Sequence, residues 1–141
     1  MSDIKLNTTQ QKACDESKWN FSDLKVLILN CTMKRTPNLS HTEGVLNIAK
    51  AIYEANGLEV EMIRPVDYEI PYGLDHLDYT GIDGYKKDDW PMIQAKIDAC
   101  DILIIGTSVW LGEKSSISNK VLERMYSYTH LFNERGQYRS Y

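Results

Sequence analysis

The sequence predicts an α/β domain with a parallel β-sheet, and three segments carry that prediction. Residues 25–31 (KVLILNC) and residues 102–106 (ILIIG) are short aliphatic runs rich in β-branched side chains, which is typical of buried strands. Residues 41–55 follow the first run and place apolar side chains at helical spacing. A strand, a helix and a strand joined by short connections form a right-handed unit with parallel strands.

Length and charge limit the class of protein. The chain has 141 residues and a formal net charge of −4, which fits one domain without the basic face that binds nucleic acid. No apolar run approaches the roughly 20 residues of a membrane-spanning helix, and residues 1–23 lack the apolar segment of a signal peptide. We therefore expect a cytoplasmic protein with no membrane or nucleic-acid partner, made of an extension (residues 1–23) and a domain (residues 24–141).

The three cysteines, Cys14, Cys31 and Cys100, are widely spaced. An odd count without a close pair argues against a disulfide framework, and no zinc or iron–sulfur spacing is present. Cys31 and Cys100 lie in apolar patterns and are interpreted as buried core thiols, and Cys14 as an exposed one. We expect no metal site.

The first half of the chain divides into a short helix near residues 9–17, a strand at residues 24–31 and a helix from His41. The run Ser40-His41-Thr42-Glu43 matches the capping-box pattern, so Ser40 is the expected N-cap, and Asn56-Gly57 ends the helix. The buried stripe of this helix is expected to consist of Val45, Ile48, Ala49, Ile52 and Ala55.

The second half continues the alternation of strands and helices. Residues 58–62 alternate in polarity, as a half-exposed edge strand does. Residues 66–89 form a long acidic loop that lines a pocket or covers a dimer face. A second helix begins at Asp89-Trp90-Pro91. The four aliphatic residues at 102–105 predict a strand covered on both faces and therefore central, before a third helix at about residues 116–128.

Polar loops at residues 32–40 and 107–115 each follow a buried strand. In a sheet ordered 2-1-3 both loops leave the same carboxyl edge, at the crevice where flavodoxin-like sheets bind a mononucleotide. The first loop offers hydroxyl groups and cations to a phosphate, although the same hydroxyl groups can merely cap the helix. A Glu43 that joins the cap would place a negative charge beside the phosphate. The loop lacks the glycines of Walker and dinucleotide motifs.

The second loop places Trp110 and Gly112 just beyond a strand. Backbone N–H groups and a flat apolar wall suit a planar ring with polar edges, such as isoalloxazine. The alternative is that Trp110 is a packing residue.

Two segments of the chain resemble one enzyme family. Residues 101–124 (DILIIGTSVWLGEKSSISNKVLER) resemble the NADPH-dependent FMN reductases, in which a strand ending in Gly precedes a Pro/Ser-x-aromatic-x-Gly loop and a Ser-containing helix. Residues 25–46 (KVLILNCTMKRTPNLSHTEGVL) are similar to the first strand and phosphate loop of the same family. The resemblance covers residues 24–128.

The resemblance implies a flavodoxin-like three-layer fold, bound FMN and NAD(P)H as co-substrate. It implies an oxidoreductase that passes a hydride from NAD(P)H through the flavin to a flavin, a quinone or a similar small-molecule acceptor. No side chain is required as a general acid or base, so we name no catalytic residue. The resemblance implies that the cofactor-binding residues are Thr32, Lys34, Ser40, His41 and Thr42 around the phosphate and Ser108, Val109, Trp110, Leu111 and Gly112 along the ring.

The family's sheet has five strands, whereas residues 24–141 hold three expected strands, so the fourth and fifth are missing and the domain is incomplete at its C-terminus. The third strand would then leave an aliphatic edge open. Either the chain is a truncated product, whose last residues 136–141 lead into a fourth strand, or another copy or partner covers the edge. A homo-oligomer is therefore expected. Two alternatives to the oxidoreductase stay open: a flavodoxin-like electron carrier, and a form that retains no flavin and serves only in association.

Overall fold

A three-stranded parallel sheet forms the centre of the fold. In the computed structural model, which describes residues 4–73, 87–129 and 135–136, the strand order is β2-β1-β3. The middle strand β1 spans Lys25–Cys31, and β2 (Glu59–Ile63) and β3 (Ile102–Thr107) run parallel to it on either side. The predicted flavodoxin-like order 2-1-3 is confirmed.

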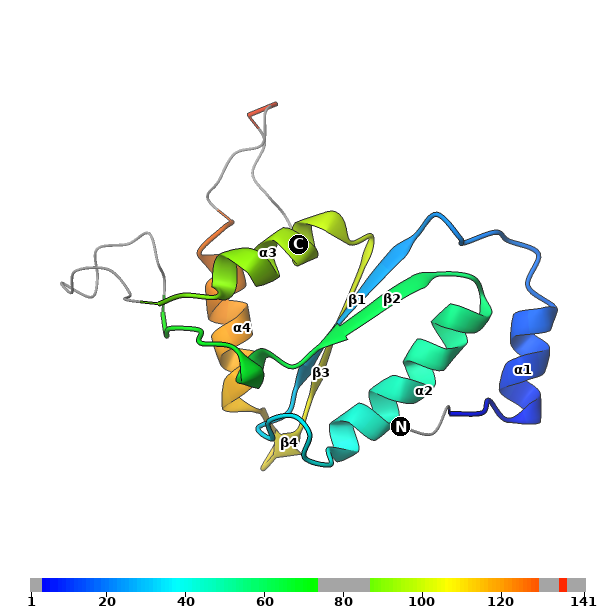
Figure 1. Cartoon of the computed structure of the whole chain (residues 1–141), viewed down its shortest axis with the longest axis horizontal. Coiled ribbons are helices and arrows are strands. Elements are labelled where there is room, and N and C mark those ends of the chain that lie inside the picture. The colour runs from blue at the N-terminus through cyan, green and yellow to red at the C-terminus, as the bar shows by residue number, and fades with distance from the viewer. Residues whose placement is uncertain (1–3, 74–86, 130–134, 137–141) are drawn as a thin grey trace.

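Helices cover both faces of this sheet (Figure 1). The helix α2 (His41–Ala55) lies on one face, and α3 (Trp90–Ala99) and α4 (Ser116–Tyr126) lie on the other. A further helix, α1 (Thr8–Asp15), packs against the outer side of α2. The result is the three-layer arrangement expected from strands that alternate with helices along the chain.

The strand β1 supplies both halves of the core because its side chains alternate between the two faces. Leu27 and Leu29 pack in a cluster with α3 and α4, whereas Val26 and Ile28 pack in a second cluster with α2. All four side chains are at most 3% exposed. Burying one Leu or Ile side chain stabilises a fold by about 1.5–3 kcal/mol, which explains why this strand reads as a continuous apolar run.

The prediction that residues 102–106 form a central strand is wrong for the part of the chain that the structure describes. There β3 is the outer strand of the sheet, next to β1 alone. Each of its six residues is half-buried, because no further strand covers its second edge within the described residues. An outer parallel strand of aliphatic residues is unusual, since parallel strands are normally buried on both sides.

The predicted buried stripe of α2 is also wrong. Val45 is 69% exposed and Ile48 is 39% exposed, whereas Leu46, which the stripe omits, is only 6% exposed. Leu46 packs against the backbone of Gly106 in β3. Since α2 is apolar over most of its circumference, periodicity alone does not determine which side meets the sheet.

The described part of the N-terminal extension, residues 4–23, contacts the rest of the protein through Cys14 and Phe21. Asn56 Nδ2 at the end of α2 lies 3.2 Å from Cys14 Sγ, so Cys14 is half-buried rather than exposed as expected. Phe21 packs against the cluster beneath α2, whereas Trp19 is 79% exposed. The expectations for residues 74–86 of the acidic loop and for residues 137–141 lie outside the described residues.

We expect Gly106→Ala to destabilise the protein because α2 approaches β3 too closely for a side chain. A Cβ at Gly106 would lie 2.5 Å from Leu46 Cδ1 and 2.9 Å from Leu46 Cγ. Overpacking of this kind lowers the free energy of unfolding by about 1–3 kcal/mol, which urea titration measures. The matched control is Gly44→Ala, where a Cβ meets nothing within 4 Å. Equal stability of the two variants would contradict the close approach.

Candidate functional site

The two polar loops leave the sheet side by side because β1 and β3 are in register at their ends. Cys31 pairs with Thr107 as the last pair of the two strands. Beyond that pair, Thr42 Oγ1 in the first turn of α2 lies 3.3 Å from Ser108 Oγ. Residues 66 positions apart in the chain therefore meet at one edge, which is the edge at which the sequence predicts the crevice. Figure 1 shows the first loop and β4 together at this end of the sheet.

Ser115 fastens the second loop to the end of β1. Its hydroxyl donates to the Cys31 carbonyl oxygen at 2.7 Å and accepts from Ser118 N at 3.1 Å as the N-cap of α4. Its backbone N–H donates to Thr107 Oγ1 at 3.0 Å. Ser115 is fully buried, so these bonds fix where the second loop begins and ends relative to the first.

The second loop is a β-hairpin, which the sequence did not predict. Val109–Trp110 (β4) pairs with Glu113–Lys114 (β5) across a two-residue turn. Both turn residues have positive φ, 52° at Leu111 and 82° at Gly112, as a type I′ turn requires. A leucine in this conformation costs on the order of 1–3 kcal/mol, and such strain gathers at ligand sites.

The hairpin presents apolar side chains to solvent. Val109 is 64% exposed, Trp110 is 52% exposed and Leu111 is fully exposed. Met33 and Leu39 in the first loop are also exposed. The alternative that Trp110 is a packing residue is therefore disfavoured. Contiguous exposed apolar groups rimmed by polar residues are typical of a binding surface.

Several hydroxyl groups of the first loop hold the loop itself. Ser40 is the N-cap of α2, as predicted, and its Oγ accepts from Glu43 N at 3.3 Å. Thr32 Oγ1 accepts from Lys34 N at 3.3 Å. Thr32 and Ser40 are buried, which supports the view that these two hydroxyl groups organise the loop. By contrast, His41 and Thr42 open the helix, where backbone N–H groups have no partner within the helix and can accept an anion.

Two residues that follow β2, Arg64 and Asp67, form hydrogen bonds with the first loop. The Arg64 guanidinium donates from Nη1 to the carbonyl oxygens of Lys34 and Asn38, each at 3.0 Å, and from Nη2 to the Glu43 carboxylate. Asp67 accepts from Thr36 N at 3.0 Å and from Thr36 Oγ1 at 2.7 Å. The Glu43 carboxylate therefore pairs with Arg64, and its charge beside the helix N-terminus is compensated.

The predicted site residues belong to the two loops and to the first turn of α2, which meet at the carboxyl edge of the sheet. Lys34 is exposed on the first loop, His41 is exposed at the start of α2, and Thr42 meets Ser108. Sequence reasoning missed Arg64 and Ser115. The available signals were an arginine directly after a strand at the carboxyl edge and a serine directly before a helix, and neither pattern alone indicates a partner across the sheet.

The Cys31 thiol is buried at the end of β1 and stays protonated at neutral pH. Burial raises its pKa from 9.0 to about 12, and the hydrogen bond with Ser118 lowers it by a smaller amount. The thiolate is the reactive form of cysteine, so Cys31 is a core residue, as predicted. Burial also raises the pKa of the Cys100 thiol.

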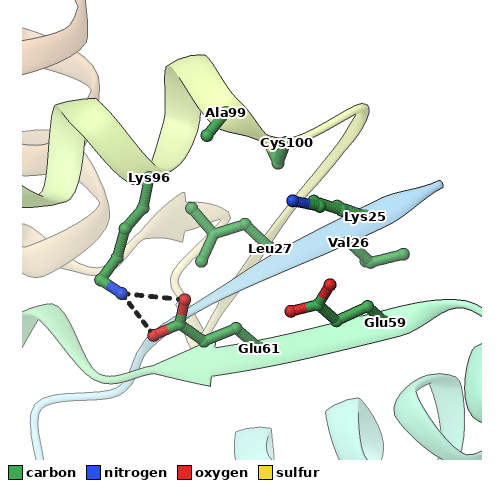
Figure 2. Close-up of a pocket in the computed structure, with 8 residues that line it drawn as sticks. All are labelled: Lys25, Val26, Leu27, Glu59, Glu61, Lys96, Ala99 and Cys100. Atoms are coloured by element: carbon green, nitrogen blue, oxygen red, sulfur yellow. Dashed lines mark hydrogen bonds and ion pairs between the residues drawn. The ribbon is translucent and has the colours of Figure 1, made fainter. Parts of the chain in front are cut away.

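A separate cavity of about 170 Å³ lies at the opposite, amino end of the strands (Figure 2). There Lys96 Nζ bridges the two carboxylate oxygens of Glu61 at 2.7 Å and 2.9 Å, and this hydrogen bond raises the pKa of Lys96. Lys25 and Glu59 line the same cavity. The two loops leave the other end of the sheet.

The fold and the paired loops define a flavodoxin-like domain with a crevice at its switch point. The chain belongs to the NADPH-dependent FMN reductase family, whose profile matches residues 24–137. Among the residues that the structure describes, no helix is long and apolar enough to cross a membrane.

The chain is similar to known proteins and to a solved structure. The 8-demethyl-8-aminoriboflavin-5′-phosphate synthase of Streptomyces davaonensis is 35% identical over 121 residues, which cover 84% of this chain and 47% of that protein. The crystal structure of RosB with the bound intermediate 8-demethyl-8-formylriboflavin-5′-phosphate matches with a TM-score of 0.70 and 34% identity, over 81% of this chain and 46% of RosB. The divalent metal cation transporter MntH of Mycobacterium bovis is 36% identical over 86% of this chain and 17% of that protein. The chain thus spans about half the length of the two flavin-related proteins.

The raised pKa of Cys31 predicts a specific loss of stability in alkali. The unfolded chain ionises this thiol near its ordinary pKa of 9.0, whereas the folded protein keeps it protonated up to about 12. Its contribution to stability is therefore complete below pH 9 and falls as the pH rises through that window. Between about pH 8 and about pH 10 the parent protein should lose about 1.4 kcal/mol more than Cys31→Ala. Urea titrations at both pH values measure this, and equal losses would contradict it.

Proposed function

We propose that this chain binds a flavin 5′-phosphate in the crevice and serves as an FMN-dependent oxidoreductase. The phosphate lies against the first loop and the N-terminus of α2, and the isoalloxazine ring lies along the hairpin. The residues proposed to form the flavin site are those named from the sequence: Thr32, Lys34, Ser40, His41, Thr42, Ser108, Val109, Trp110, Leu111 and Gly112. The buried Thr32 and Ser40 contribute by holding the first loop in place.

The observation that supports this proposal most directly is the 3.3 Å contact between Thr42 Oγ1 and Ser108 Oγ. It brings the anion-binding end of a helix and an exposed aromatic hairpin to one point. A flavin mononucleotide has an anion at one end and a flat apolar ring with polar edges at the other. Family membership points to the same ligand.

The chemistry of the reaction belongs to the flavin, and the protein supplies position and polarity. When bound, the ring accepts a hydride from NAD(P)H and passes two electrons to a second flavin, a quinone or a similar small molecule. A second cavity of about 290 Å³ lies beside the first loop and is lined by side chains of both charges, Arg35, Lys87 and Lys120 with Asp67 and Glu69. Lys87 pairs with Glu69 and Lys120 lies over the Tyr72 ring, so we assign no ligand to this cavity.

A second candidate treats the flavin phosphate as substrate rather than cofactor. It is favoured by the similarity to RosB, whose crystal structure contains a riboflavin-5′-phosphate intermediate. The electron carrier is the third candidate. Steady NAD(P)H oxidation in the presence of a quinone favours the reductase, a modified flavin recovered after incubation favours the second candidate, and a bound but inert flavin favours the carrier.

The edge of β3 that no described strand covers supports a further part of the proposal, namely that a second copy of the chain covers it. Its six half-buried residues include four large aliphatic side chains. If the chain retains flavin only as a dimer, the amount of bound flavin should rise with the fraction of the protein that is dimeric. Light scattering over a range of protein concentrations, with and without FMN, measures this.

The primary test is whether the purified protein binds FMN. Flavin fluorescence should be quenched on addition of the protein, and an absorbance band should appear between the near-ultraviolet and blue wavelengths. NAD(P)H should then bleach that band. FMN that stays fully fluorescent with excess protein would overturn the proposed function.

We expect Trp110→Ala to weaken FMN binding. Trp110 is 52% exposed on the hairpin, and stacking on one aromatic side chain contributes on the order of 1 kcal/mol, which is about fivefold in Kd. Trp19→Ala is the matched control, because Trp19 is also exposed, at 79%, and is not among the residues proposed to form the flavin site. Fluorescence titration measures both, and an unchanged Kd in Trp110→Ala would contradict the placement of the ring.

A further inference from the structure

We propose that Arg64 is the positioning residue that makes the first loop able to accept the flavin phosphate, an inference that rests on the proposed function. Arg64 directly follows β2 and is 8% exposed. It lies below the loop rather than on its surface. Its role is therefore to arrange the groups that meet the phosphate rather than to touch the phosphate.

The contacts of Arg64 are with the groups of the loop that would repel an anion. Two of them are the carbonyl oxygens of Lys34 and Asn38, each 3.0 Å from Nη1. The third is the Glu43 carboxylate, paired with Nη2. Carbonyl oxygens turned toward a buried guanidinium are turned away from the ligand, and a carboxylate paired with a cation no longer opposes a phosphate at the same helix N-terminus.

The position of Glu43 makes this compensation necessary. Glu43 is in the first turn of α2, beside the N–H groups of His41 and Thr42 that would accept the phosphate. Its side chain is only 20% exposed, so water screens its charge poorly. Without Arg64 a poorly screened negative charge would share the helix N-terminus with a dianion. The planar fork of arginine also suits three acceptors in different directions, which the single amine of lysine does not.

The test compares FMN with riboflavin, because the two ligands share the ring and differ in the phosphate. The ratio of the riboflavin Kd to the FMN Kd reports the phosphate site alone. Arg64→Met should lower this ratio by about tenfold or more, since it removes charge-assisted hydrogen bonds and leaves Glu43 unpaired, while the riboflavin Kd stays nearly constant. Arg64→Lys should give an intermediate ratio.

Glu43→Gln should change the ratio of the riboflavin Kd to the FMN Kd in the opposite direction from Arg64→Met. It keeps the contacts of Arg64 with both carbonyl oxygens and removes the negative charge, so the ratio should rise. Damage to the fold would lower FMN binding in both variants, which separates positioning from a merely structural role. The double variant Arg64→Met/Glu43→Gln should recover part of the ratio. Lys96→Met, which breaks the Lys96–Glu61 pair at the other end of the sheet, is the matched control and should leave the ratio unchanged.

The outcomes distinguish the two proposals. A parent protein that binds neither flavin overturns the proposed function and this inference with it. A parent protein that prefers FMN, together with an Arg64→Met variant of unchanged ratio, overturns the role of Arg64 alone. If Arg64→Met does not fold, Glu43→Gln decides, because a lower ratio in that variant overturns the inference.

Discussion

Cys31 and Thr107 end neighbouring parallel strands opposite each other, and the rest of the candidate site depends on that register. A shift of one residue would turn every side chain of the strand to the other face and would separate the two loops. The side chains of β1 prevent such a shift, because alternate residues are buried against helices on both faces of the sheet. The bond from Ser115 to the Cys31 carbonyl oxygen then fixes the hairpin relative to the first loop.

A single buried cation, Arg64, and not an excess of basic residues, compensates the negative charge at this edge of the sheet. The chain is acidic overall, with a formal net charge of −4, and an acid stands in the first turn of the helix that faces the crevice. The buried Arg64 compensates that acid and two carbonyl oxygens. A buried ion pair contributes little to net stability because of its desolvation cost, so we interpret this pair as a device that shapes the loop.

The hairpin, unlike the buried Arg64, is exposed. It holds Leu111 at positive φ, and three consecutive apolar side chains face solvent. Both features lower stability in the isolated chain. Exposed apolar side chains that lie together are typical of a surface that binds another molecule. Leu46 of α2 packs closely against Gly106 of β3, the strand that precedes the hairpin.

The sequence by itself determined the three strands of the sheet, the helices and the two loops, because the period of apolar side chains and the capping residues are local signals. The order 2-1-3 is not a local signal, and its prediction depended on the likeness to flavodoxin-like domains. Tertiary structure decided the rest: the side of α2 that meets the sheet, the hairpin at residues 109–114 and the exposed edge of β3. It also decided the partners of Arg64, which lie 21 to 30 residues away in the chain, and the bond from Ser115 to Cys31, 84 residues away. Such contacts depend on how the packed layers orient each loop, and no local pattern in the sequence encodes that orientation.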